Sequence, residues 1–208
     1  MKAMTHDDST DRTTPVATER GSGRRLGRAE RREQIIDAAT RAFAEAGGFA
    51  QAGLADVASA AGVTRMILYR HFDSKTELYR AAIDRAAERL HAAAVVDGEM
   101  DDESVARVFR WARSEPDAFR LLFRHAAREP EFRDDIDELK AAMIARVRPY
   151  LEETITGEPW QAWAAQFSTL VIIEAVMAWL DAGAPGGDDA IHRILRSVDS
   201  AIESIGSG

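Results

Sequence analysis

A short run near the N-terminal end, from Thr64 to Phe72, carries side chains that can hydrogen-bond to a nucleic acid. If the run is helical, Ile67, Leu68 and Phe72 face inward and a polar outer face remains. That face holds Arg65, Met66, Tyr69, Arg70 and His71. Arginine can donate two hydrogen bonds to guanine, methionine can contact a thymine methyl group, and tyrosine or histidine can donate to phosphate. We therefore interpret the run as a helix that enters the major groove of DNA.

A turn and two further helices are expected to hold this helix in place. Just before it, apolar residues recur at helical spacing, at Leu54, Val57, Ala58 and Ala61. Gly62 can adopt the positive φ of a tight turn, and the Thr64 hydroxyl can cap the next helix. An upstream helix from Glu30 to Ala46 has an apolar stripe that includes Ile35 and Phe43, which should pack against both. The pattern is that of a helix-turn-helix.

The segment from Val57 to Ile83, VASAAGVTRMILYRHFDSKTELYRAAI, resembles the DNA-binding domain of the tetracycline-repressor (TetR) family of bacterial transcription regulators. The turn, the cap and the Tyr-x-His-Phe ending stand in the family's register, and the resemblance covers roughly residues 29–83. It implies that Thr64 and Lys75 also contact DNA. It further implies a helical C-terminal domain that binds a small-molecule effector and forms a homodimer. Each polar residue taken singly is more simply a solvated side chain, and only their shared register favours DNA contact.

Two departures from the family pattern bear on DNA binding. Ala52 and Gly53 stand where the family usually has a threonine that contacts phosphate, so this contact is lost or is taken over by backbone N–H groups. Met66 stands where glycine or proline is frequent, and its side chain should project toward the groove. An extra glycine at Gly47–Gly48 is expected to have no consequence in a loop.

The N-terminal tail is polar from Met1 to Gly23, and we expect it to be disordered. A basic run, RRLGRAERR, follows at residues 24–32. We predict that Arg24, Arg25 and Arg28 follow the DNA backbone or enter the minor groove. The alternative is a solvated charge run at a frayed helix start.

The charge distribution supports two functional parts. Of the 208 residues, 30% are charged and 46% are hydrophobic, with a net charge of −8. Residues 24–80 hold 10 basic and 7 acidic side chains, whereas residues 81–208 hold 14 basic and 24 acidic ones. We therefore assign a DNA-binding domain to residues 24–80 and an effector-binding and dimerisation domain to residues 81–208. The fold class is all-α.

Six further helices are predicted after the helix-turn-helix. Their expected ranges are 75–95, 103–113, 117–128, 131–156, 160–182 and 190–205. Ser74 and Glu77 form a capping box at the start of the first of these helices. Pro149 should kink or break the fourth, because proline removes a backbone hydrogen bond.

The segment from Trp160 to Ala182 is apolar almost all round. A transmembrane helix is one reading, but Gln166, Ser168 and Glu174 interrupt the segment and it is barely long enough to span a bilayer. We prefer a soluble homodimer without membrane contact, with a four-helix bundle formed by this helix and the next from two subunits. The predicted interface residues are Trp160, Leu170, Ile173, Met177, Leu180, Ile191, Leu195, Val198 and Ile202.

An effector cavity is expected among the helices of the C-terminal part, where aromatic residues are frequent. The candidate lining residues are Phe109, Trp111, Phe119, Phe123, His125, Met143, Trp163, Phe167 and Glu174. The alternative is that the aromatic residues pack in the core and line no cavity. Glu174, an acid inside an apolar helix, favours an uncharged or cationic apolar effector.

Catalytic and cofactor motifs are not found in the sequence. It has no cysteine, no nucleotide-binding glycine motif and no metal-spaced histidine pair, and His125 with Glu129 is a common surface pair. We therefore predict no enzyme activity, no metal and no cofactor. The expected function is that of a cytoplasmic, ligand-responsive transcription regulator, a repressor that binds a palindromic operator as a dimer. The alternative is a helical small-molecule-binding or scaffold protein whose DNA-binding head is weakened, as Ala52 and Gly53 suggest.

Overall fold

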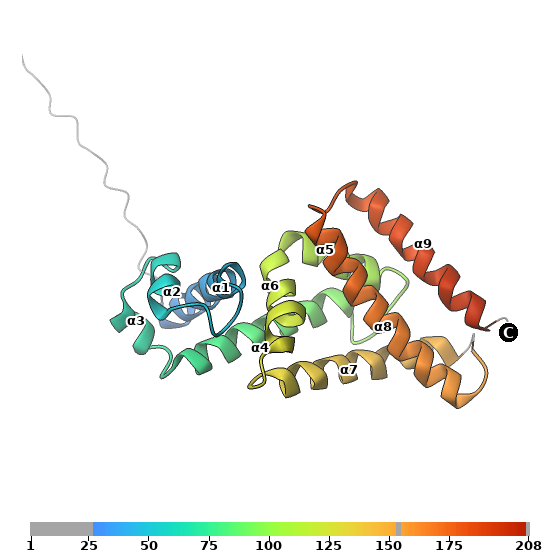
Figure 1. Ribbon diagram of the computed structural model, residues 1–208, viewed down its shortest axis with the longest axis horizontal. Helices are drawn as coiled ribbons and strands as arrows, with labels where there is room; N and C mark the ends of the chain where they lie inside the picture. The colour runs from blue at the N-terminus through green and yellow to red at the C-terminus, as the bar shows by residue number, and fades with distance from the viewer. Residues whose placement is uncertain (1–26, 153–154, 207–208) are drawn as a thin grey trace, which may run out of the picture.

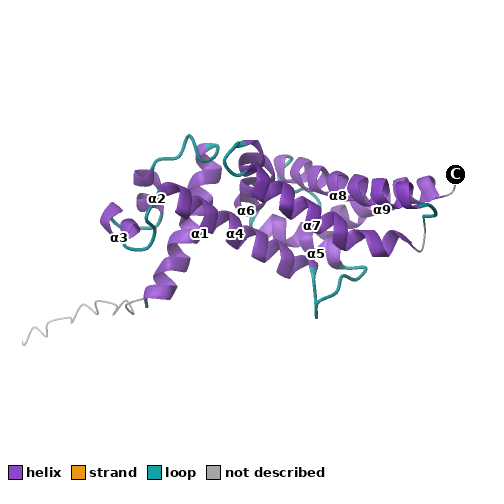
Figure 2. Cartoon of the chain, turned by 90° about the horizontal axis from the view of Figure 1, so that it is seen from below, coloured by secondary structure: helices purple, strands orange, loops and turns teal. Residues whose placement is uncertain are grey.

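The computed structural model describes residues 27–152 and 155–206, and these residues form helices joined by short loops (Figure 2). In this part of the chain the only β-type pairing is an isolated bridge between Val96 and Glu99. The expected all-α class is confirmed. The helices are α1 Arg28–Ala46, α2 Leu54–Ala60, α3 Arg65–Tyr69, α4 Lys75–Ala94, α5 Ser104–Ser114, α6 Pro116–Arg120, α7 Arg133–Glu152, α8 Glu158–Asp181 and α9 Gly187–Gly206.

Helices α1, α2 and α3 form a small unit, residues 27–74, which we call the head and which lies at one end of the long axis (Figure 1). Its core contains Ile35, Phe43, Val57 and Leu68, all at most 2% exposed. Gly47 ends α1 in the left-handed conformation, with φ of 94°, which a residue with a side chain adopts only at a cost. The head therefore has the local structure that the sequence predicted.

Helix α4 joins the head to the remaining helices, α5 to α9, which we call the body (Figure 1). Leu78 and Tyr79 on α4 are fully buried near the head, and Leu90 is buried near the body. One continuous apolar core runs from Ile35 in the head to Ile191 in the body. The predicted domain boundary near residue 80 thus falls inside a helix rather than in a linker.

In the body, α7 packs along α8, while α5 packs against α4, α8 and α9 (Figure 1). A second, small apolar cluster of Leu151, Ile155, Ala164 and Ala165 closes the end where α7 meets α8. This arrangement leaves one face of α8 uncovered.

Two predicted helices differ from the structure. The expected helix 117–128 is divided into α6, a π-helical turn at Leu121–His125 and a 3-10 turn at Ala126–Arg128. Such a change of hydrogen-bond register depends on the packing around it and leaves no mark in apolar periodicity. The expected helix 131–156 is described from Arg133 to Glu152, so it begins two residues later than expected and continues through Pro149 without a break.

Candidate nucleic-acid interface

Helix α3 turns one side toward the core of the head and the other toward solvent. Thr64 Oγ1 accepts a hydrogen bond from Ile67 N at 3.4 Å, so the predicted N-cap is confirmed. Leu68 and Phe72 are buried, whereas Met66 is 68% exposed and Tyr69 55% exposed. Arg65 and Arg70 are exposed as well. The outer side of α3 therefore presents the polar residues that the sequence assigned to it.

A basic groove lies between the start of α1 and the end of α3. It has a volume of about 410 Å³ and is lined by Gly27, Arg28, Arg31, Arg70 and His71. Burial, and then the positive charges of Arg28, Arg32 and Arg31, lower the pKa of His71 below the ordinary value of 6.5. The guanidinium groups of Arg28, Arg31 and Arg70 line the groove and give it the positive charge that attracts a phosphate.

Two other predicted contacts are placed differently. The Lys75 ammonium lies over the Phe49 ring, 4.4 Å from its centroid, and so is engaged within the protein. Gly53 N–H donates to Asp56 Oδ2 at 3.0 Å, so this backbone group is not available to replace the missing threonine. Arg24 and Arg25 of the predicted arm lie outside the described residues.

Comparison with known proteins agrees with this geometry. Residues 35–82 match the model of the "Bacterial regulatory proteins, tetR family". The chain is 46% identical over 68 residues to the HTH-type transcriptional activator FasR of Mycolicibacterium smegmatis, covering 33% of this chain and 31% of that protein. The residues that the family model matches include α2, α3 and the Thr64 cap. The head of this chain therefore resembles the DNA-binding domain of TetR-family regulators.

Two longer matches extend over the body of the chain. The HTH-type transcriptional repressor BepR of Brucella suis is 28% identical over 196 residues, covering 85% of this chain and 92% of that protein. A TetR-like transcriptional regulator from Rhodococcus sp. RHA1, of known crystal structure, superposes with a TM-score of 0.67 at 23% identity, over 88% of this chain and 96% of that one. The structural match concerns the fold alone. The first curated relatives are matched over only about a third of their length.

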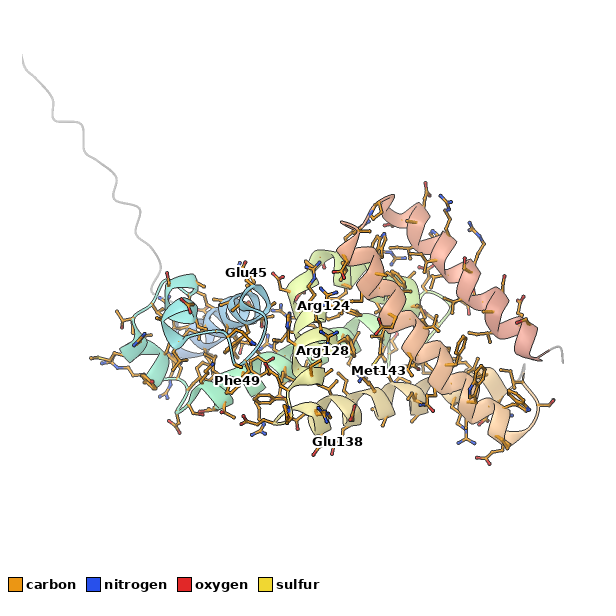
Figure 3. The ribbon with its side chains drawn as sticks, viewed as in Figure 1. Glu45, Phe49, Arg124, Arg128, Glu138 and Met143 are labelled. Atoms are coloured by element: carbon orange, nitrogen blue, oxygen red, sulfur yellow. The ribbon has the colours of Figure 1, made fainter. Side chains whose placement is uncertain are left out.

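The body of the chain contains an apolar cavity bordered by α4, α5, α7 and α8 and open at one side. Its volume is about 120 Å³. The apolar lining residues include Leu90, Val105, Val108, Leu139, Met143 and Ile172. Of the predicted lining residues only Met143, on α7 beside α8, is among them (Figure 3).

The other predicted lining residues lie elsewhere. Phe109, Trp111 and Phe119 are buried in the core, which is the packing alternative. The Phe119 ring packs at a tilt against half-buried Phe123, and His125 lies where the body meets the head, near Gly48. On α8, Trp163 and Glu174 are exposed, and the Phe167 ring stacks on Trp163 at 4.9 Å. Because Glu174 points away from the cavity, its charge gives no reason to expect a cationic effector.

The predicted dimer residues divide into two groups. Five of them are buried inside the protomer and cannot supply accessible surface: Ile173, Met177, Leu180, Ile191 and Val198. Leu195 and Ile202 are half-buried. Trp160 and Leu170 are 58% and 39% exposed, and Trp163, which the prediction assigned to the cavity, is 44% exposed beside them. The exposed apolar side of α8 therefore differs from the predicted set.

Helix α8 is also the one helix in residues 27–152 and 155–206 that is long and apolar enough to cross a membrane. Half of its most apolar window is buried against the rest of the chain, and one helix of this length and composition is weak evidence for a membrane span. Among the described residues, no three histidine or acidic side chains gather as a metal-binding group.

Proposed function

We propose that this chain is a ligand-responsive transcription regulator of the TetR family that binds a palindromic operator as a homodimer and acts in the cytoplasm. The observation that carries the proposal is the outer side of α3, where Arg65, Met66, Tyr69 and Arg70 are exposed beside a groove lined by Arg28 and His71. The α3 side chains can reach base edges while the groove holds a phosphate. Two heads of a dimer would read half-sites about one helical turn apart, roughly 34–36 Å.

Helix α4 provides a physical link for a ligand response. Its C-terminal half lines the apolar cavity through Leu90, His91 and Ala94. Its first residue, Lys75, contacts Phe49 of the head. A ligand that binds more tightly to one position of α4 than to another would favour that position and so move the head relative to the body. The change in DNA affinity would be limited by the difference between the ligand's affinities for the two positions.

The uncovered side of α8 supports the homodimer. Trp160, Trp163 and Leu170 lie at helical spacing, and the rings of Trp160 and Trp163 meet edge to face at 5.8 Å. Exposed tryptophans that adjoin one another are typical of the buried centre of a protein interface. A second copy of α8 on this side would bury them.

Binding to DNA from the chain's own upstream region tests the proposal. We expect binding that resists unrelated competitor DNA and weakens steeply with salt, because phosphate contacts release counterions. Arg65→Ala should weaken binding by about 1–3 kcal/mol if Arg65 contacts a base. Arg193→Ala, an exposed arginine on α9 far from the head, serves as the control and should bind as the parent does.

The direction of regulation is proposed as repression, because a dimer that covers a promoter excludes the polymerase without any further contact. Transcription of a reporter behind the upstream region should then fall when the chain is expressed, and a rise would indicate activation.

The second candidate, a helical ligand-binding or scaffold protein with a weakened head, is favoured by the Gly53–Asp56 hydrogen bond, which occupies the position of a phosphate contact. Equal, weak binding to upstream and unrelated DNA would support it.

A further inference from the structure

Apart from His91 and Arg146, the described residues that line the cavity between α4, α5, α7 and α8 offer no free polar side chain. Two hydroxyl groups line it, on Ser104 and Thr169. Ser104 Oγ accepts from Asp101 N at 2.8 Å and from Arg107 at 2.9 Å, and Thr169 Oγ1 donates to Ala165 O at 2.8 Å. Because both hydroxyls are used within the protein, the interior suits an apolar body.

The size of the cavity limits that body. An apolar protein cavity of roughly 150 Å³ holds benzene. The cavity here is about 120 Å³ and is open at one side. A ligand of about six to eight carbon atoms can therefore enter, with its end at the opening.

The opening carries two cationic or hydrogen-bonding side chains, His91 at the end of α4 and Arg146 on α7, and both are exposed. Arg146 makes no ion pair with any described carboxylate, and its one hydrogen bond, to Gly98 O, is long at 3.5 Å. No described carboxylate lines the cavity. The nearby Asp101 is paired with Arg107 at 2.9 Å, so its charge is compensated.

We propose that the effector of this chain is a small amphiphile with one anionic group, whose apolar body fills the cavity and whose carboxylate binds Arg146. This inference rests on the proposed function and names the chemical class of its ligand. His91 lies at the same opening and donates a second hydrogen bond to the carboxylate. Arginine suits this role because its planar group can donate two parallel hydrogen bonds to a carboxylate.

Calorimetric binding to the full-length chain tests the inference with three probes that share one apolar body: octanoate, 1-octanol and octylamine. Octanoate should bind about fivefold more tightly than octanol, because one partly exposed ion pair increases affinity by about that factor. Octylamine should bind most weakly. In the variant Arg146→Met, octanoate and octanol should bind equally.

Two further variants make the result specific to this site. Arg133→Met removes an exposed arginine from the same helix, outside the cavity, and should keep the preference for octanoate. Ala142→Phe places a larger side chain at an exposed position that lines the cavity, and should weaken both octanoate and octanol. Three results would overturn the inference. Octanol or octylamine would bind as tightly as octanoate, octanoate would not bind, or Arg146→Met would keep the preference for octanoate.

Binding of the same preparation to its upstream DNA separates this inference from the proposed function. A chain that binds the DNA but not octanoate remains a regulator and contradicts the inference. A chain that binds octanoate through Arg146 but shows no specific DNA binding supports the inference and contradicts the proposed regulator.

Discussion

Glu129, in the body, accepts a hydrogen bond from the backbone N–H of Phe49, in the loop between α1 and α2 of the head. The two residues are 80 positions apart in the chain. The Phe49 ring contacts both Tyr79 and Phe132, with centroid distances of 5.2 and 5.1 Å, and those two rings contact each other at 4.6 Å, so the hydrogen bond is set beside an aromatic cluster. Burial, reinforced by the Glu129 carboxylate, raises the pKa of Tyr79, which therefore stays neutral. The Phe49–Glu129 hydrogen bond therefore links the body directly to the head.

This link predicts that Gly48→Ala destabilises the chain more than Gly47→Ala. Both glycines have a positive φ, 119° and 94°, so alanine is strained at either position, by about 1–3 kcal/mol. At Gly48 a Cβ would also lie 2.6 Å from Glu129 Oε1, whereas at Gly47 it would meet no atom within 4 Å. Urea unfolding should show an extra loss of about 1 kcal/mol for Gly48→Ala, of the order of one hydrogen bond. Equal losses would show that Glu129 does not restrain the loop.

A pH dependence of stability is predicted for His125, which lies beside the same loop. Burial first, and then Arg124 and Arg128, lower its pKa, while the Gly47 backbone and Glu129 act in the opposite direction. The unfolded chain then binds a proton more readily than the folded chain, so stability falls as the pH drops below about 6.5. His125→Gln should reduce the difference in Tm between pH 7.5 and pH 5.5. His192→Gln, an exposed histidine on α9, should leave that difference unchanged.

DNA binding should strengthen as the pH falls from 8 to 6, because of His71. Its pKa is lowered in the free protein by burial and by neighbouring arginines, and a phosphate in the groove would raise it. Binding would therefore take up a proton, and one proton changes the affinity by at most about tenfold per pH unit. Fluorescence anisotropy with upstream DNA at several pH values measures the slope. His71→Gln should flatten it, and an unchanged slope would remove His71 from the interface.

The homodimer should depend on the exposed side of α8. Leu170→Arg places a charge at a position that is 39% exposed in the protomer, so the helix should still form while the dimer is lost. Sedimentation velocity should show a monomer, and circular dichroism should show unchanged helicity. Ser200→Arg, at an exposed position on α9, is the matched control and should remain dimeric. A dimeric Leu170→Arg variant would place the interface elsewhere.

Residue types and their spacing were enough to predict the local structure of the head. The Thr64 cap on Ile67 and the Ser74 cap on Glu77 are formed between residues three positions apart. Helical spacing of Leu68 and Phe72 likewise separated the buried side of α3 from the exposed one. Such features depend on neighbours within one turn, so residue types and spacing are enough to predict them.

The contacts that each apolar or charged side chain makes became clear only from the packing of the helices. The sequence assigned Phe109 and Met143 to an effector cavity and Ile173 to a subunit interface, but apolar residue types could not distinguish either role from packing in the core. Those outcomes depend on helices far away in the chain, as does the Phe49 ring that lies beneath Lys75. The spacing of apolar residues in a helix predicts which of its sides is buried. Which residues that side contacts depends on how all the helices pack together.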